Sequence, residues 1–310
     1  MFLTSLYKKL ASPITSRLSQ IESRLLREIE QSRILAAQPL IQTIKNYGKL
    51  ENLANAEFKV FSQWGEDGII QYLISKITIP NPVFVEFGVE NYTEANTRFL
   101  LMNNNWSGLV MDANQDNINQ IANSELHWRY DITARKAFIT KENIKQLMHE
   151  FGVSGDIGLL SIDIDGNDYW IWDAISADTI SPRIVVVEYN SVFGKDLAIT
   201  TPYISDFVRA TAHYSNLYYG ASLKAFYLLA QKKGYVFVGS NSAGNNAFFV
   251  RKDVSNSFHE CSVQSGYVES KFRESRDKTG KLSFVKSKNR LDILNGQMVY
   301  DIEKDKLVKL

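Results

Sequence analysis

From about residue 56 onward, short unbroken apolar runs alternate with segments whose apolar residues recur at helical spacing. Runs rich in Val, Ile and Leu indicate strands buried on both faces, and their alternation with helices indicates a mostly parallel sheet covered on both sides. The last two runs are separated only by "NSAGN", too short for a helical crossover, so the last strand should run antiparallel. The expected strands are 83–88, 108–114, 126–132, 157–165, 183–190, 234–240 and 246–252. The pattern therefore predicts an α/β fold with a doubly wound, seven-stranded sheet.

Residues 1–50 have a different pattern and predict a helical arm ahead of the main domain, which we place at 51–252. Four apolar residues of the arm follow a four-three-four spacing that puts them on one helix face, as in a short coiled coil: Ile14, Leu18, Ile21 and Leu25. This favours an arm that packs on its own domain or on a partner copy, and we expect a homo-oligomer. The alternative is peripheral contact of the first ten residues, which include Lys8 and Lys9, with an anionic membrane surface.

Residues 253–310 are polar and contain two turn signals, "DKTGK" and "LNGQM". We expect an accessory tail with hairpins and no core of its own.

The composition narrows the functional classes. The chain has 35 basic and 34 acidic side chains among 310 residues, so no global field favours nucleic acid as a partner. Its one cysteine, Cys261, cannot form an intrachain disulfide, and four histidines offer no zinc-finger spacing. No stretch approaches the ~18 apolar residues of a membrane-spanning helix. We therefore expect a cytoplasmic protein, with peripheral attachment at the inner face of the membrane as the alternative.

Acidic residues end five successive predicted strands. Ligands of doubly wound sheets bind beyond the carboxyl ends of the strands, and carboxylates crowded at one edge repel each other unless something binds among them. The residues at these ends are Glu86 with Gly88, Asp112, Asp131, Asp163 with Asp165, and Glu188.

A nucleoside cofactor suits this edge. Asp112 follows Gly88 at the distance where a second strand delivers an acid to a ribose. The turn "EFGVENYTEAN" has a single glycine and lacks a pyrophosphate cradle, which disfavours a dinucleotide. S-adenosylmethionine is the common nucleoside cofactor without phosphate.

Four motifs, "VFVEFG", "WSGLVMDAN", "LLSIDIDGNDYWIW" and "VVVEYN", together resemble the class I S-adenosylmethionine-dependent methyltransferases, especially the FkbM-like group of glycan biosynthesis clusters. The resemblance covers about residues 58–250, and the flanking "SQWGEDGII" and "FRESRD" are also similar to bacterial proteins of this kind. It implies a Rossmann-like methyltransferase fold and a carbohydrate acceptor. It also implies that Glu86 and Gly88 border the methionine, that Asp112 holds the ribose, and that Asp131 and Ile132 flank the adenine. The chain departs from the pattern where Tyr92 and Thr93 replace a further glycine.

The aspartates after the fourth strand predict a metal site. Asp163 and Asp165, two apart on a strand, would point to one face, and Glu188 ends the neighbouring strand. The three could bind Mg²⁺ or Mn²⁺, as in metal-dependent sugar O-methyltransferases. Asp163 is also our candidate for contact with the cofactor and for catalysis. The alternative is a plain turn at Asp165, with a helix cap at Asn167 or Asp168.

Methyl transfer to a hydroxyl needs a base, and we predict His213, which lies in the long insertion after the fifth strand. Asn245 and Asn246 are either polar contacts or turn formers. The predicted function is a carbohydrate O-methyltransferase assisted by a divalent metal. Two alternatives remain open: a nucleotide-sugar glycosyltransferase, because "IDID" also fits a D-x-D site, and a non-catalytic assembly protein built on a degenerate domain.

Overall fold

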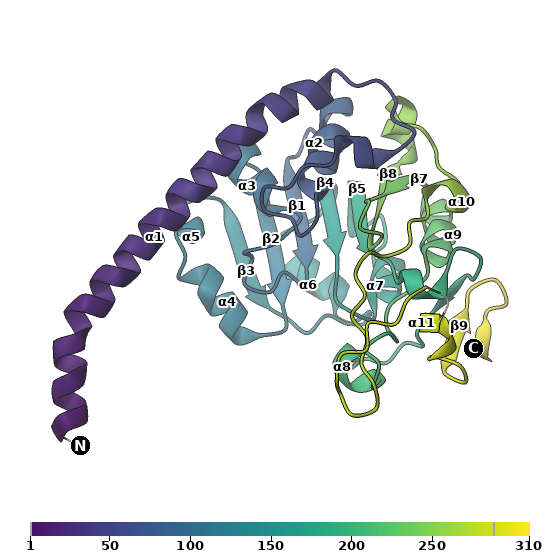
Figure 1. Ribbon diagram of the computed structural model, residues 1–310. Coiled ribbons are helices and arrows are strands. Elements are labelled where there is room, and N and C mark those ends of the chain that lie inside the picture. Colours follow the sequence, from purple (N-terminus) through teal and green to yellow (C-terminus); the bar gives the residue numbers. More distant parts are fainter. Residues whose placement is uncertain (1, 288) are drawn as a thin grey trace.

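A computed structural model of the chain describes residues 2–287 and 289–310, with the backbone alone described for residues 2–12, 14 and 19. Seven strands form one sheet in the order β3-β2-β1-β4-β5-β8-β7 (Figure 1). They are β1 (Val83–Phe87), β2 (Ser107–Asp112), β3 (Ile132–Lys136), β4 (Gly155–Ile162), β5 (Ile180–Glu188), β7 (Tyr235–Ser240) and β8 (Asn246–Arg251).

Strands β1 to β5 pair in parallel, whereas β8 pairs antiparallel with both β5 and β7. The predicted fold class is confirmed, including the antiparallel direction of the last strand of this sheet. From β1 the chain first builds outward to β2 and β3 and then returns to β4 on the other side of β1. The strand order therefore reverses between β1 and β4, where a doubly wound sheet opens a crevice for ligands.

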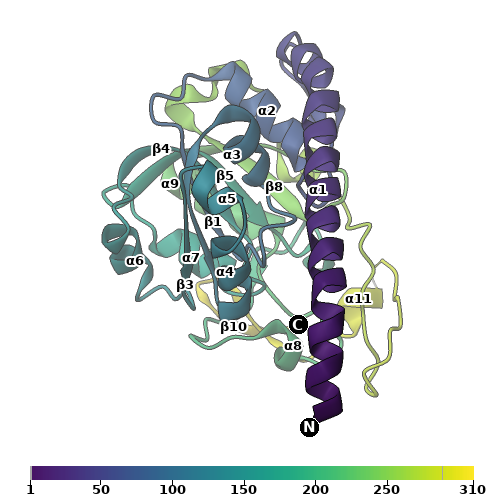
Figure 2. The same cartoon turned by 90° about the vertical axis from the view of Figure 1, so that its left-hand side faces the viewer.

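Helices cover both faces of the sheet because the side chains of each strand alternate. In β1, Val85 and Phe87 join the apolar cluster on one face, and Phe84 joins the cluster on the other. Figure 2 shows α6 and α1 on opposite sides of the sheet. The first face is covered by α6 (Ile144–Glu150), α7 (Asp168–Ala174), α9 (Leu223–Lys233) and α10 (Val263–Gly266). The second is covered by the end of α1 (Phe2–Lys45) with α2 (Glu66–Lys76), α3 (Arg98–Asn104), α4 (Gln115–Ala122) and α5 (Leu126–Arg129).

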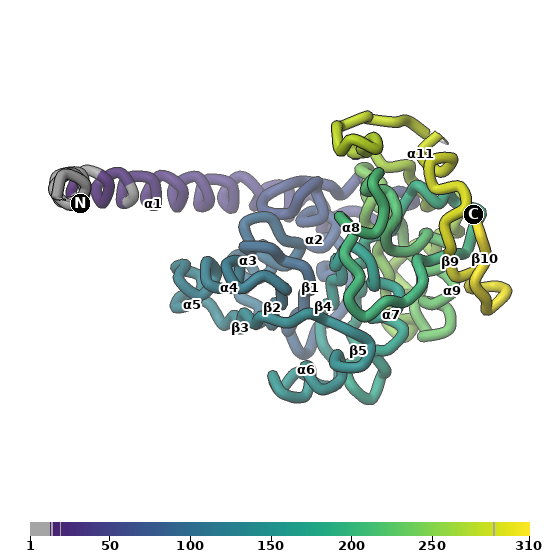
Figure 3. Tube along the Cα trace, turned by 90° about the horizontal axis from the view of Figure 1, so that it is seen from below, coloured from purple at the N-terminus to yellow at the C-terminus, as the bar shows by residue number. Residues whose placement is uncertain are grey.

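Helix α1 is the predicted helical arm, and its two halves differ. The C-terminal half packs on the domain through the buried Ala37, Ile41 and Ile44. An ion pair between Glu30 and Arg98, 2.7 Å long, adds to this contact. The N-terminal half leaves the domain, as Figures 1 and 3 show from two directions. None of the helices in the described part of the chain combines the length and apolar character of a membrane crossing.

The C-terminal residues contribute to a small second core, so the expectation of a tail without one is wrong. Strands β9 (Met298–Asp301) and β10 (Lys306–Lys309) extend β6 (Ile199–Thr200), a short strand of the insertion after β5. Leu294 and Val299 of the tail are buried against Phe193 and Leu217 of that insertion. Each apolar run of the tail is too short to predict a core from the sequence. These runs are buried only because they pair with the insertion. The remaining short helices are α8 (Arg209–Ala212) and α11 (Asn289–Asp292).

Candidate functional site

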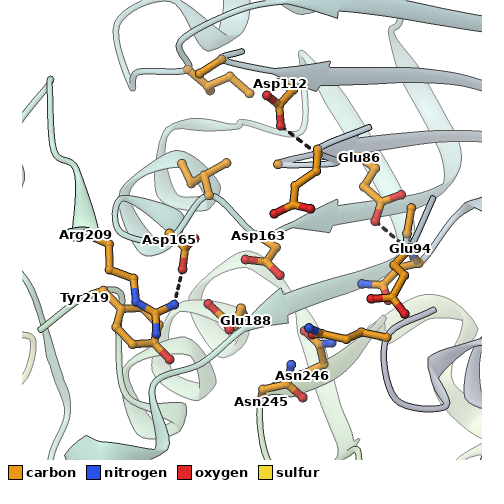
Figure 4. Close-up of a pocket in the computed structure, with 18 of the residues that line it drawn as sticks. Glu86, Glu94, Asp112, Asp163, Asp165, Glu188, Arg209, Tyr219, Asn245 and Asn246 are labelled. Carbon is orange, nitrogen blue, oxygen red and sulfur yellow. Dashed lines mark hydrogen bonds and ion pairs between the residues drawn. The ribbon is translucent and has the colours of Figure 1, made fainter. Parts of the chain in front are cut away.

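A cavity of about 440 Å³ opens at the carboxyl edge of the sheet, at the reversal point between β1 and β4 (Figure 4). This volume falls within the range of small-molecule sites. Residues at the carboxyl ends of β1, β2, β4 and β5 line it, together with segments 63–64, 94–96, 137–139 and 245–246 and the single residues Phe207, Arg209, Tyr219, Ser270, Phe272 and Glu274. The edge that the acidic strand ends predict is thus the edge where the cavity lies.

Asp163, Asp165 and Glu188 converge in this cavity, and each offers a carboxylate oxygen within 4.8 Å of the others. Their convergence is confirmed, but the reason given from the sequence is wrong. Strand β4 ends at Ile162, so Asp163 and Asp165 lie beyond it. Asp165 has a left-handed backbone, with φ of 57°, and this turn, not strand alternation, directs its side chain back toward Asp163.

Asp168 stabilises that turn. Its carboxylate accepts the backbone N–H groups of Ile164 and Gly166 at 2.8 and 2.9 Å. Burial raises the pKa of Asp168 to about 6, and these two N–H groups oppose the rise. Asp168 therefore has the structural role that we considered as the alternative for this region. Asp163 and Asp165 face the cavity.

Among the described lining residues the acidic cluster has one basic neighbour, Arg209, which no sequence pattern identifies. Arg209 of α8 forms an ion pair with Asp165, and its guanidinium lies 3.7 Å from the centre of the Tyr219 ring (Figure 4). Burial, with the nearby Glu188 carboxylate, raises the pKa of Asp163, and burial with Asp165 raises that of Glu188. One guanidinium does not balance three carboxylates, so the donor set fits a hard divalent cation bound through oxygen.

Asp112 lies at the other end of the cavity, at the end of β2 as predicted. Its oxygens accept the N–H groups of Glu90 and Asn114, both at 2.8 Å, and the side-chain amide of Asn117 at 3.1 Å. A carboxylate has about four acceptor positions, so Asp112 has room for about one more donor. This fits one hydroxyl of a ribose.

Glu86 and Gly88 line the cavity as predicted, but both also have structural roles. The buried Glu86 carboxylate accepts the N–H groups of Asn96 and Thr97, which fixes the loop before α3, and burial raises its pKa. Gly88 has φ of 74°, and a Cβ there would lie 1.5 Å from the carbonyl oxygen of Asp163. The glycine is needed where the ends of β1 and β4 approach each other.

The predicted positions of Asp131 and Ile132 are wrong. Residues 126–129 form the helix α5, and β3 begins only at Ile132, so Asp131 precedes the strand instead of ending it. Both residues lie at the amino edge of the sheet, where Asp131 accepts the N–H of Gly108 through its carbonyl oxygen. The apolar residues beside Asp112 in the cavity are Ala137, Phe138 and Ile139, which follow β3. They are the better candidates to flank an adenine.

The prediction that His213 acts as the base is also wrong in its geometry. His213 does not line the cavity. Its Nδ1 is 2.7 Å from Ser215 Oγ, and its ring packs on Tyr214 with centroids 4.3 Å apart. Burial lowers its pKa. The histidine is a structural residue of the insertion.

The two flanking motifs supply part of the cavity wall. Trp64 of "SQWGEDGII" and both Phe272 and Glu274 of "FRESRD" line it, although neither motif suggested a role from its own residues. The tail is held there by Ser270, whose N–H donates to Ser191 Oγ at 3.0 Å. The accessory tail is thus part of the site.

No protein-family model and no curated protein matches this chain. Similar solved structures include a S-adenosylmethionine-dependent methyltransferase from Clostridium acetobutylicum ATCC 824, 9% identical over 60% of this chain and 90% of its own, with a TM-score of 0.38. Another is TrmK of M. capricolum in complex with S-adenosyl-homocysteine, 12% identical over 62% and 71%, with a TM-score of 0.33. A third is the CurJ carbon methyltransferase, 9% identical over 64% and 56%, with a TM-score of 0.39. At these identities and scores, the function has to be argued from the cavity itself.

Proposed function

We propose that the protein is a S-adenosylmethionine-dependent O-methyltransferase that acts on a carbohydrate with the help of a divalent cation. The observation that carries the proposal is that a single cavity at the strand-order reversal contains both Asp112, whose carboxylate could accept a ribose hydroxyl, and three converging carboxylates that could hold a cation. The carbohydrate acceptor follows from the motif resemblance, and the cavity is compatible with it.

Different lining residues would bind the cofactor and the acceptor. Asp112 would accept a ribose hydroxyl, and Ala137 to Ile139 would cover the adenine. S-adenosylmethionine would supply the methyl group on a sulfonium, and a positive sulfonium suits the acidic lining. Asp163, Asp165 and Glu188 would hold the cation and orient the acceptor hydroxyl. Asp163 is the carboxylate that we assign to receive the hydroxyl proton, in place of His213.

Calorimetric titration of the full-length protein with S-adenosylhomocysteine, with and without Mg²⁺, tests this function. Micromolar binding is expected, because the site buries a nucleoside and offers a charged acceptor. UDP is titrated in parallel. Absence of heat with S-adenosylhomocysteine from a folded sample, together with Mg²⁺-dependent binding of UDP, would transfer the assignment to the glycosyltransferase alternative.

We also propose that the arm pairs with a second copy of this chain. Four side chains of α1 that precede the Glu30–Arg98 ion pair are between 47 and 59% exposed: Leu18, Ile21, Leu25 and Ile29. Residues 12 apart, such as Leu25 and Ala37, are rotated by about 120°, so this stripe faces away from the domain. Ile14, which the sequence adds to the stripe, has its side chain outside the described residues.

The charges beside the stripe favour a second copy over an anionic membrane. Arg17 and Arg24 alternate with Glu22 and Glu28, so both signs are present, and a copy of the same helix can complement them. A helix that binds an anionic membrane carries mainly basic residues on its polar face. The residues between positions 2 and 10 that suggested membrane contact have side chains outside the described part of the chain.

Replacing Leu18 and Leu25 by Lys is expected to convert a dimer into a monomer, because two like charges would enter the apolar seam. Light scattering coupled to size exclusion measures the change. Lys at the exposed Gln20 and Ser23, which lie about 200° and 140° from Leu18 around the helix and so outside the stripe, serves as the control. A wild-type protein that is monomeric at all concentrations, or a dimer that survives both Lys substitutions, contradicts the pairing.

A further inference from the structure

We propose that the acceptor is a glycan whose reacting end carries neither phosphate nor carboxylate, and that its sugar ring rests on Trp64 and Phe272 at the cavity rim. This inference rests on the proposed function and narrows its substrate class to neutral sugars and amino sugars. Three independent features of the cavity support it: its charge, its unpartnered oxygen atoms and its exposed aromatic side chains.

The charge of the lining opposes an anionic acceptor. Eight carboxylates line the cavity, and among the described lining residues Arg209 is the single basic one. Arg209 is already engaged with Asp165. A phosphate or diphosphate group is normally bound by Arg, Lys or free backbone N–H groups. The N–H groups of Ile164 and Gly166, at the turn before α7, are occupied by the Asp168 carboxylate. The lining carboxylates are Glu86, Glu90, Glu94, Asp112, Asp163, Asp165, Glu188 and Glu274.

A bound divalent cation would reduce this charge without providing a phosphate site. Two positive charges offset part of the Asp163, Asp165 and Glu188 cluster, but the carboxylates outside it remain. Sites that bind a nucleotide diphosphate through a metal also place Lys or Arg on the phosphates. No lysine occurs among the described residues of this lining.

Two amide oxygens in the lining have no hydrogen-bond partner. The side chains of Asn167 and Asn246 are each 4% exposed, and the Oδ1 atom of each is unsatisfied. Their orientation is fixed by the other end of each amide, because Asn167 Nδ2 donates to the Ile204 carbonyl at 2.9 Å and Asn246 Nδ2 donates to Glu66 at 3.0 Å. Hydroxyl and ammonium groups can donate to such oxygens, whereas an ionised phosphate cannot. Figure 4 shows Asn246 on the side of the cavity where Glu188 lies.

Trp64 and Phe272 provide the apolar surface that a sugar ring needs. They are 40 and 41% exposed and line the same cavity. Their backbones are fixed, since the Trp64 N–H donates to Glu66 at 2.9 Å and the Phe272 N–H donates to Ser270 Oγ at 3.1 Å. Both segments contact the turn 241–246. Glu66 accepts the Asn241 amide at 2.6 Å, and the Lys271 N–H donates to the Ala243 carbonyl at 2.8 Å. The segments that carry the two aromatic side chains are thus both tied to the turn that contains Asn246.

The test is a glycan array probed with labelled full-length protein in S-adenosylhomocysteine and Mg²⁺, with neutral, amino, uronic-acid and phosphorylated glycans as probes. Binding confined to the neutral and amino classes is expected. Trp64→Ala should weaken that binding at least tenfold. Trp128→Ala, which removes a tryptophan that is 70% exposed on α5 and does not line the cavity, should leave it unchanged. Neither substitution should change the calorimetric affinity for S-adenosylhomocysteine.

Preferred binding to phosphorylated or uronic-acid glycans overturns the proposal. So does the absence of binding to every glycan while S-adenosylhomocysteine still binds, and so does equal behaviour of the two tryptophan variants. In each of these cases the proposed binding of S-adenosylmethionine is unaffected. Loss of S-adenosylhomocysteine binding in the wild-type protein is a different result, because it removes the proposed function itself and this inference with it.

Discussion

Asp112→Ala is expected to weaken S-adenosylhomocysteine binding by about 100-fold or more. The carboxylate lies at the end of β2 and has acceptor capacity for a ribose hydroxyl beyond its bonds to Glu90 and Asn114. A hydrogen bond to a charged acceptor contributes about 1.5–3 kcal/mol, and the loop that this carboxylate holds would also lose its order. About 2.7 kcal/mol corresponds to a factor of about 100. Calorimetry on the two proteins measures the difference.

Asp131→Ala is the matched control for this variant. The sequence predicts that both aspartates end a strand and contact the cofactor, Asp112 at the ribose and Asp131 at the adenine. The structure places Asp131 at the opposite edge of the sheet, so its removal should leave the affinity within about twofold. An Asp112→Ala protein that melts normally and binds S-adenosylhomocysteine as tightly as the wild type would remove Asp112 from the site. A large loss of affinity with Asp131→Ala would show that the sheet edges are assigned wrongly.

The contrast between Asp112 and Asp131 shows what the sequence can predict here. Strand β2 is an unbroken apolar run followed by an acid, and this pattern predicts a buried strand. Residues 126–132 mix apolar, aromatic and charged side chains, and this mixture fits a short helix as well as a strand. Because residues 126–129 form a helix, β3 begins only at Ile132, and the proposed adenine contact falls to Ala137 and its neighbours instead.

His213 and Arg209 illustrate a second limit. They are four residues apart in an insertion without regular periodicity, yet only Arg209 reaches the cavity. Which of them does so depends on the small core that the insertion forms with the C-terminal tail, and that core is made of contacts between segments about 80 residues apart. A residue type that suits the chemistry, such as histidine, gives no information on such packing. Trp64 and Phe272 are likewise placed by contacts between distant segments, because Glu66 accepts the Asn241 amide and the Lys271 N–H donates to the Ala243 carbonyl.

Glu188→Gln is expected to abolish binding of Mn²⁺ and, in the absence of metal, to raise the melting temperature. Glu188 is one of three converging carboxylates, and removal of its charge takes away one of the three oxygen ligands that best suit a hard cation. Burial and the neighbouring Asp165 raise the pKa of Glu188 to about 8, so the metal-free protein must take up a proton there when it folds at neutral pH, and Gln removes this cost. Glu188→Gln should therefore lose metal binding while the metal-free protein becomes more stable to heat.

The measurements are Mn²⁺ binding by electron paramagnetic resonance and thermal unfolding with and without Mg²⁺. Mg²⁺ at about 100 times its dissociation constant should stabilise the wild-type protein by about 2.7 kcal/mol, or roughly 4 °C, and should leave Glu188→Gln unchanged. Glu90→Gln neutralises another carboxylate of the same cavity outside the cluster and should retain the metal-dependent shift.

The direction of the change without metal separates a cation site from a structural cluster. If Asp163, Asp165 and Glu188 stabilised the fold by hydrogen bonds alone, Glu188→Gln would lower the melting temperature, and Mg²⁺ would have no effect on either protein. If they form a cation site, the free protein carries a cost that Glu188→Gln removes, and the metal-dependent gain disappears with it. Arg209 forms its ion pair with Asp165, and its charge offsets only part of the rise in the pKa of Asp163 and of Glu188. The unbalanced pair, Asp163 and Glu188, is therefore where an added positive charge should stabilise the protein most.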